Sequence, residues 1–160
     1  MTTPHAVFSR NSDEWETPDN VFLPLQEEFG FTLDAAASWE NKKCETFFSA
    51  KSLALPWRSE GAKAPVVWLN PPYSLCRDFL RKAALEREAG CTVVCLVPSR
   101  TDTRWWHDIV WDATRHCARP GVAIRFVKGR IRFKGALNSA PFPSSILVFT
   151  PDIEIEGIWR

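Results

Sequence analysis

Residues 92–97, with the sequence Thr-Val-Val-Cys-Leu-Val, restrict the possible folds more than any other segment. The run is short, rich in β-branched side chains and apolar on both faces, which indicates a strand rather than a helix. Such a strand needs cover on both sides, as strands of parallel sheets have when helices pack on each face. The run therefore predicts an α/β fold in three layers, with a mostly parallel sheet in the middle.

Most of the remaining sequence alternates predicted helices with predicted strands. Residues 19–29 show helical spacing of apolar side chains between Pro18 and Gly30, which favour a helix start and a helix end. Further helices are predicted at 75–88 and 103–115, and strands at 31–35, 44–48, 65–69, 122–127 and 145–149. Because no helix separates the last two strands, we expect antiparallel strands at the edge of the sheet.

The composition is that of an ordinary globular domain. The chain has 160 residues, of which 45% are hydrophobic and 24% are charged, so we expect a single domain over residues 1–160. No apolar run approaches the roughly 18 residues of a membrane helix, and the first ten residues lack the apolar core of a signal peptide. Five cysteines without Cys-x-x-Cys spacing indicate a reducing compartment and argue against disulfides and zinc. We therefore expect a cytoplasmic protein with no metal and no membrane segment.

A basic segment covers residues 113–151, which contain seven Lys and Arg residues and no Asp or Glu. Such a charge distribution is expected where a protein meets phosphates, so it indicates nucleic-acid binding. Within the segment Arg130, Arg132 and Lys134 alternate with Ile131 and Phe133, so an extended chain would place the charges outward and the apolar side chains inward. The alternative is that these charges pair with acidic residues earlier in the chain.

Three polar segments follow predicted strands, at residues 34–38, 70–73 and 98–103. In open α/β sheets, ligands bind beyond the carboxyl ends of the strands. The three segments are therefore expected to converge on one site.

The segment Asn70, Pro71, Pro72 and Tyr73 carries the most specific chemistry. The amino group of adenine or cytosine is a poor nucleophile because its lone pair is delocalised into the ring. The Asn70 side-chain oxygen and the Pro71 carbonyl could accept both N–H hydrogens and free that lone pair, while the prolines hold the carbonyl rigidly and add no competing donor. Tyr73 offers a flat face for an extruded base. The alternative is a rigid strand-to-helix turn without chemistry.

Several stretches together resemble the phage-type DNA N6-adenine methyltransferase family, whose members are Rossmann-like, S-adenosylmethionine-dependent class I methyltransferases. The stretches are residues 14–18 (Glu-Trp-Glu-Thr-Pro), 31–38 (Phe-Thr-Leu-Asp-Ala-Ala-Ala-Ser), 41–44, 53–57, 70–73, 97–106, 129–133 and 141–149. The resemblance implies methyl transfer to the N6 nitrogen of adenine in DNA, double-stranded rather than single-stranded. It also implies a single methyltransferase domain without a separate target-recognition domain, encoded by a phage or prophage and acting in a bacterial host.

The same resemblance implies a set of cofactor-binding residues. The set comprises Trp15, Thr17, Pro18, Asp34, Ala35, Ala36, Ser38, Asn41 and Ser52. Residues 15–18 would lie against the methionine part of S-adenosylmethionine, and residues 34–38 would wrap its amino acid and ribose. The sequence departs from the usual pattern where alanines replace a glycine-rich turn, so the turn must be of a type that does not need positive φ. It departs again at residues 51–53, where related enzymes carry an acid.

The residues expected to contact DNA are Arg100, Arg130, Arg132, Phe133 and Lys134. For the segment 98–103 two interpretations stay open, because it could line the base pocket or its Asp102 and Thr103 could cap the following helix.

Three rival functions share parts of this pattern. A cytosine-N4 methyltransferase uses the same acceptor chemistry. An enzyme that methylates the glutamine amide of release factors also carries Asn-Pro-Pro-Tyr, but normally with a separate N-terminal domain and a glycine-rich cofactor turn. A non-catalytic nucleic-acid-binding module of the same fold is the third. The oligomeric state and the recognition sequence are not predicted.

Overall fold

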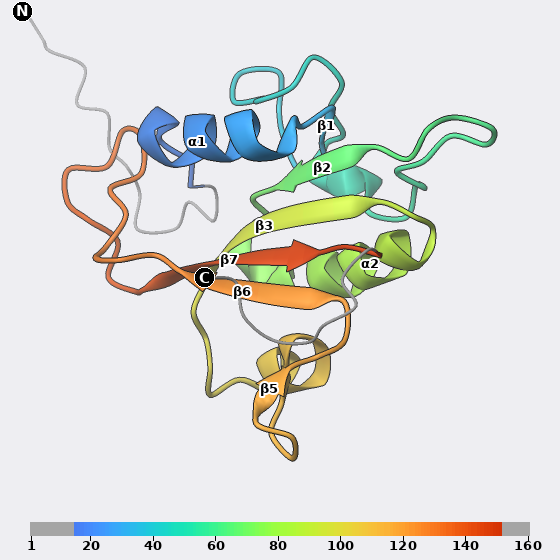
Figure 1. Ribbon diagram of the computed structural model, residues 1–160. Coiled ribbons are helices and arrows are strands. Elements are labelled where there is room, and N and C mark those ends of the chain that lie inside the picture. The colour runs from blue at the N-terminus through green and yellow to red at the C-terminus, as the bar shows by residue number, and fades with distance from the viewer. Residues whose placement is uncertain (1–14, 152–160) are drawn as a thin grey trace, which may run out of the picture.

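A five-stranded sheet lies at the centre of the computed structural model, which describes residues 15–151 (Figure 1). Its strands stand in the order β1 (Leu33–Asp34), β2 (Val66–Leu69), β3 (Thr92–Pro98), β7 (Ser144–Phe149) and β6 (Val122–Phe126). β1, β2 and β3 run parallel, and β7 runs antiparallel to both β3 and β6. The predicted mixed sheet is confirmed, with the antiparallel pairing at one side.

The reversed strand β7 lies second from the edge rather than at it. All six residues of β7 are buried, whereas β6 becomes half-exposed and then exposed toward its end. A strand apolar on both faces is more stable inside a sheet than at its rim, so β6 takes the edge.

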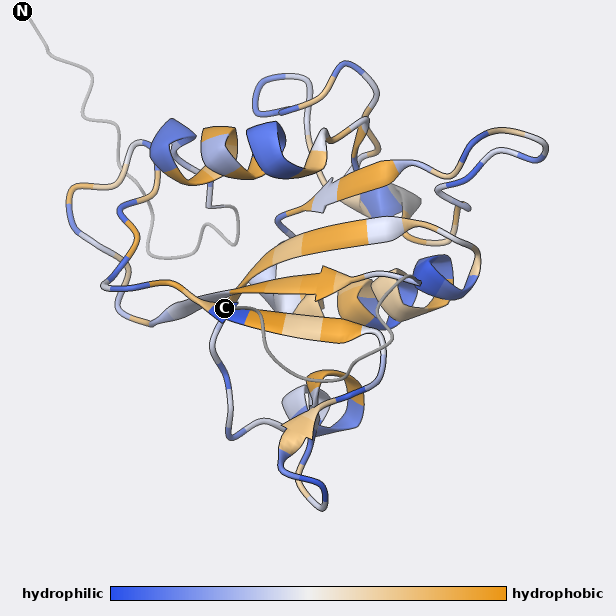
Figure 2. Cartoon of the chain, in the orientation of Figure 1, coloured by the Kyte–Doolittle hydropathy of each residue, from blue (hydrophilic) through white to orange (hydrophobic). Residues whose placement is uncertain are grey.

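The two faces of the sheet are covered by different helices. Val93, Cys95 and Val97 of β3 belong to a buried cluster with α2 (Cys76–Glu88), which follows the short 3-10 turn η2 (Tyr73–Leu75). Val94 and Leu96 belong to a second cluster with α1 (Asp19–Phe29). Figure 1 shows α1 and α2 on opposite sides of the sheet, and Figure 2 shows apolar residues along the strands between them. The three layers predicted from residues 92–97 are confirmed, and the thiol of Cys95 within this strand is buried.

The strand predicted at residues 44–48 is reduced to a single bridge between Asp34 and Phe47. Asp34 and Phe48 still exchange a backbone hydrogen bond, in which the Phe48 N–H donates over 2.8 Å. Just before this segment, the Lys43 N–H donates to the Asp34 carboxylate at 2.9 Å and not to a neighbouring strand. The predicted strand at 31–35 is likewise shortened to two residues.

The helix predicted at residues 103–115 is confirmed only for residues 104–110 and is wrong for residues 111–115. One π-helical turn, η3 (Trp106–Val110), is followed by β4 (Trp111–Asp112), which pairs with β5 (Cys117–Ala118). The Arg119 guanidinium donates from two nitrogens to the His107 carbonyl, at 2.9 and 2.7 Å, and the Arg119 N–H donates to the Val110 carbonyl at 2.8 Å. These bonds satisfy carbonyls that a continued helix would otherwise use, so the chain turns back after one turn.

Four loops emerge at the same edge of the sheet because β1, β2, β3 and β6 all point the same way. They are residues 35–50, 70–73, 99–105 and 127–143. Within residues 15–151, no helix is long and apolar enough to cross a membrane.

Candidate active site

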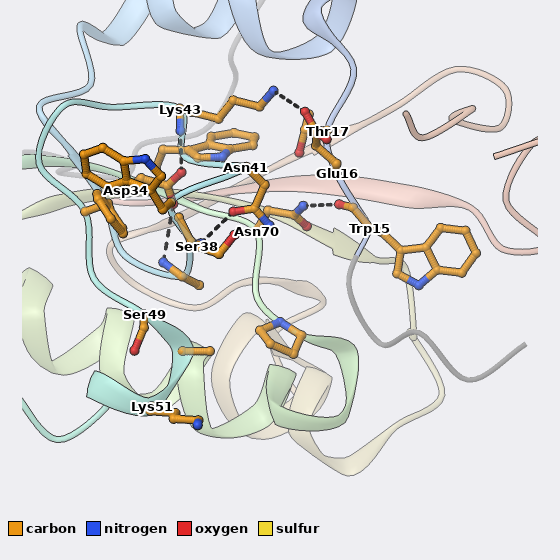
Figure 3. Close-up of a pocket in the computed structure, with 17 residues that line it drawn as sticks. Trp15, Glu16, Thr17, Asp34, Ser38, Asn41, Lys43, Ser49, Lys51 and Asn70 are labelled. Atoms are coloured by element: carbon orange, nitrogen blue, oxygen red, sulfur yellow. Dashed lines mark hydrogen bonds and ion pairs between the residues drawn. The ribbon is translucent and has the colours of Figure 1, made fainter. Parts of the chain in front are cut away.

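A cavity of about 440 Å³ opens at the carboxyl ends of β1 and β2 (Figure 3). Six of the nine predicted cofactor residues and two of the four predicted catalytic residues line it. They are Trp15, Thr17, Asp34, Ala36, Ser38, Asn41, Asn70 and Pro72. Segments far apart in the sequence therefore meet in one pocket, as the position of the polar loops predicted.

The other five predicted cofactor and catalytic residues are not among those that line this cavity. Ala35 is 1% exposed and packs in the cluster below the sheet, and Pro71 is buried. Pro18 precedes α1, and its carbonyl accepts the N–H groups of residues 21 and 22. Tyr73 lies behind the cavity in an aromatic cluster. The side chain of Ser52, at the end of the 3-10 turn η1 (Ala50–Ser52), is outside the described part of the chain.

Asp34 ends β1 and places a buried carboxyl group in the pocket wall. One of its oxygens accepts the Lys43 N–H at 2.9 Å, and the other accepts the Ala36 N–H at 3.4 Å. Burial raises the pKa of Asp34 to about 6, because the two backbone donors only partly offset the loss of hydration. An acid with this pKa is mostly ionised at neutral pH and can pair with a cationic or hydroxyl-bearing ligand.

The raised pKa of Asp34 predicts how stability depends on pH. The unfolded carboxyl has a pKa of 3.8, so between pH 3.8 and about 6 the unfolded chain loses its proton while the folded protein keeps it. The free energy of unfolding should therefore fall through this window by up to about 3 kcal/mol, and then level off. Urea denaturation of the ligand-free protein from pH 4 to 7 measures this fall, which should be smaller in Asp34→Asn. An equal pH dependence in both proteins would contradict the assignment.

The alanine turn after β1 keeps ordinary backbone angles. Among the non-glycine residues of 15–151, only His116 has a positive φ, so none of the three alanines does. The turn is closed by Asn41, whose side-chain oxygen accepts the Ser38 N–H at 2.6 Å. The expected departure from a glycine-type turn is confirmed.

Asn70 follows β2 directly and is held by the backbone of residue 15. Its side-chain nitrogen donates to the Trp15 carbonyl over 2.5 Å, across 55 residues of sequence. The Asn70 side-chain oxygen is buried and has no hydrogen-bond partner in the structure. A buried acceptor without a donor is costly, and it commonly marks a place where a ligand supplies the missing hydrogen.

Tyr73 lies in an aromatic cluster that joins the turn at residues 70–73 to the loop 127–143. Its ring is nearly parallel to that of Trp15, with centroids 6.3 Å apart, and meets Phe142 edge-on at 5.2 Å. Trp15 also contacts Phe133 at 5.3 Å, and the Arg100 guanidinium lies 6.0 Å from the Phe142 ring. The Tyr73 hydroxyl is buried without a partner, and burial raises its pKa. In this structure Trp15 and Phe142 already contact the Tyr73 ring, which had been expected to be open for a base.

The basic segment divides into paired and unpaired charges. Ile131 and Phe133 are buried while Arg130 and Arg132 are exposed, which confirms the predicted inward and outward pattern. The pattern arises without a strand, because β6 ends at Phe126. Lys134 pairs with Asp19 at 2.8 Å and Glu16 at 3.3 Å, so the alternative interpretation, pairing with acids earlier in the chain, holds for this residue.

For the segment 98–103 the helical residues do begin directly after Thr103, at Arg104, but the Thr103 hydroxyl does not cap them. The Thr103 hydroxyl instead donates to the Arg100 carbonyl at 2.7 Å, which closes a local turn.

Several pocket residues were missed from the sequence. Lys43 lines the pocket and pairs with Glu16 at 3.3 Å, and the walls also include Trp39, Phe47 and Trp68. Lys43 lies within the stretch 41–44 that resembles the methyltransferase family, so this stretch was a signal for it. No such signal marked Trp68, because it lies in an apolar strand in which every residue fits a buried position equally well.

This arrangement defines an α/β protein with a ligand pocket beyond parallel strands and an unsatisfied acceptor on an Asn-Pro-Pro-Tyr turn. Residues 5–156 match the family model described as DNA N-6-adenine-methyltransferase (Dam). The chain belongs to this DNA N-6-adenine-methyltransferase family.

Individual relatives agree with the family match. A DNA N-6-adenine-methyltransferase of Escherichia phage T1 is 40% identical over 65% of this chain, and the aligned part covers 42% of the phage protein. A DNA N-6-adenine-methyltransferase of Haemophilus phage HP1 is 26% identical over 94% of this chain and 86% of its own length. The putative methyltransferase YfdM of Escherichia coli K12 is 37% identical over 38% of this chain and 71% of its own length.

Proposed function

We propose that this protein transfers a methyl group from S-adenosylmethionine to the N6 nitrogen of adenine in double-stranded DNA. The observation that carries the proposal is the buried, unpartnered side-chain oxygen of Asn70 at the pocket wall. The printed names of the phage relatives support adenine as the substrate.

The pocket fits the proposed cofactor in size and in chemistry. Its volume of about 440 Å³ lies in the usual range for small-molecule sites. Trp39, Phe47 and Ala36 offer apolar surface, Asp34 offers a carboxylate, and the Thr17 hydroxyl is a second buried group without a partner. When bound, S-adenosylmethionine would supply an electrophilic methyl group on a sulfonium sulfur. Parallel strands with the pocket at their carboxyl ends support the Rossmann-like class I fold of such enzymes.

The residues of the catalytic turn would activate the amino group of the base. Asn70 accepts one N–H hydrogen with its side-chain oxygen, since its nitrogen is already engaged by the Trp15 carbonyl. Pro71 and Pro72 lack N–H groups, so they hold the turn rigid and add no donor that would compete for the acceptor. An acceptor that holds an N–H hydrogen pulls the amino nitrogen toward tetrahedral geometry. The lone pair is then less delocalised into the ring and is free for attack. Tyr73 would hold the base by contact with its ring.

The rival functions are disfavoured by separate observations. Cytosine N4 presents the same amino chemistry, and the names of the relatives favour adenine over it. The exposed Arg130 and Arg132 favour DNA over a protein amide. The intact acceptor of Asn70 favours a catalytic protein over a binding module. Action in the cytoplasm of a bacterial host completes the proposal.

Nucleoside mass spectrometry tests the proposed function directly. The protein is incubated with genomic DNA that lacks methylated adenine and with cofactor labelled in its methyl group. After digestion, label is expected in N6-methyladenine. Label in N4-methylcytosine alone, or no label in DNA, would contradict the proposal.

The exposed arginines predict a salt dependence of DNA binding. Each phosphate contact releases counterions, so Arg130→Ala and Arg132→Ala should each lower the slope of log affinity against log salt by roughly one unit. The loss should be similar across unrelated DNA sequences, and cofactor affinity should change little. Fluorescence anisotropy at several salt concentrations measures the slopes. Arg81→Ala is the matched control because Arg81 is exposed on α2, and unchanged slopes in both test variants would exclude phosphate contact.

A further inference from the structure

The loop between β6 and β7, residues 127–143, carries the most exposed large apolar side chain of the described chain. Leu137 is 86% exposed, compared with 74% for Phe126 and 72% for Trp39. It is followed by Asn138 and Ser139, which are also exposed. The loop is the orange segment that extends from the left side of the sheet in Figure 1.

The base of this loop is firmly held, so its tip has a defined position. The Ala140 N–H donates to the Ile131 carbonyl at 2.8 Å and closes the loop, while Ile131, Phe133 and Phe142 are buried beneath it. The Arg132 guanidinium donates to the carbonyl of residue 136 at 3.1 Å. The exposed tip around Leu137 therefore stands on a loop whose buried side chains and hydrogen bonds fix its position.

The loop is also joined to the catalytic turn. Phe142, at its end, contacts Tyr73 at 5.2 Å, and Phe133, within it, contacts Trp15 at 5.3 Å. Trp15 in turn accepts the hydrogen bond from Asn70. The loop that carries Leu137 is thus connected by aromatic contacts and one hydrogen bond to Asn70, the proposed acceptor of the target base.

The charges around the tip fit a DNA partner. Residues 113–151 contain no acid, and Arg130 and Arg132 are exposed at the foot of the loop. The acids that reach the loop from outside it, Asp19 and Glu16, are paired with Lys134. DNA-bending proteins place apolar wedges between base steps, and enzymes that act on a base must extrude it from the stack. An isolated exposed leucine is ordinary on a protein surface. Leu137, however, lies at the tip of a basic loop that contacts the proposed base-modifying site, which is where a DNA-intercalating wedge would be needed.

We propose that Leu137 is the wedge that enters the DNA duplex beside the target adenine and keeps the stack open while the base occupies the pocket. This assignment rests on the proposed function. Since unstacking a base step costs a few kcal/mol, the wedge should matter for duplex DNA and not for DNA that is already single-stranded.

The test compares native with heat-denatured genomic DNA as substrates. Leu137→Ala should lower methylation of native DNA by about tenfold or more and methylation of denatured DNA by about twofold or less, because only the duplex must be opened. Leu137→Met keeps an apolar side chain of similar volume and should retain most activity. Leu85→Ala, an equally conservative change at an exposed position on α2, is the control and should match the wild type.

Permanganate oxidation of thymines gives a second readout that needs no turnover. Wild-type protein with native DNA should expose thymines opposite the extruded base, and Leu137→Ala should not, at protein concentrations that saturate the DNA. Equal loss of methylation on both substrates, or permanganate reactivity as in the wild type, would overturn the wedge. If the wild type methylates neither DNA, the proposed function itself fails, whereas normal methylation by Leu137→Ala overturns the wedge alone.

Discussion

Asn70→Ala is expected to lower turnover by roughly 10²-fold or more, the scale of losing one preorganised polar contact to a transition state. The Asn70 oxygen would accept a hydrogen that becomes more acidic as the amino nitrogen is alkylated, so its loss appears in kcat rather than in substrate binding. Cofactor affinity, measured by calorimetry, should stay nearly unchanged. Single-turnover methylation of DNA gives the rate.

Asn70→Asp separates the two ends of the amide. Aspartate keeps an acceptor oxygen but cannot donate to the Trp15 carbonyl, so it should retain more turnover than Asn70→Ala. A rate near that of the wild type in Asn70→Ala would refute the acceptor role. Loss of cofactor binding in the same variant would instead indicate that the bond to Trp15 mainly shapes the pocket.

Tyr73→Ala is expected to weaken methylation by roughly 5- to 150-fold, which corresponds to the 1–3 kcal/mol of one base–aromatic contact. Tyr73→Phe should stay close to the wild type, because the hydroxyl that it removes is buried and makes no hydrogen bond in the structure. The measurement is kcat/KM on native DNA, with the fraction of folded protein determined for each variant. Since the Tyr73 ring also packs against Trp15 and Phe142, the comparison must be made well below the melting temperature.

The two Tyr73 variants decide between ring and hydroxyl. Equal damage from both would show that the hydroxyl acts, and the contact between base and ring would then be the wrong account.

The sequence predicts best those elements whose stability is local or whose environment is uniform. Residues 92–97 could only be a strand covered on both faces, and α1 begins after Pro18 and ends at Gly30, which has a φ of 67°. The region 103–115 misled because its apolar side chains have helical spacing while the competing partner is distant. The Arg119 guanidinium reaches back 12 residues to the His107 carbonyl, and no local pattern contains that bond.

The candidate site was predictable where a motif carries its own chemistry. Asn70 follows β2, Asp34 is the last residue of β1, and both polar side chains line the pocket. The contribution of Trp68 to the wall, and the pairing of Lys134 with Asp19, depend on which segments meet in space. Charge count alone placed Lys134 with the phosphate contacts, whereas the folded chain brings an acid to it.

The bond that orients Asn70 ends on a main-chain carbonyl, that of Trp15. Every amino acid carries that carbonyl, so mutation of position 15 can alter the aromatic wall without deleting the acceptor that holds the Asn70 amide. Substitutions at position 15 can therefore change the fit of a ligand in the pocket while the orientation of the Asn70 side chain is kept. Shifting the register of the segment by insertion or deletion would be far more disruptive than any substitution within it.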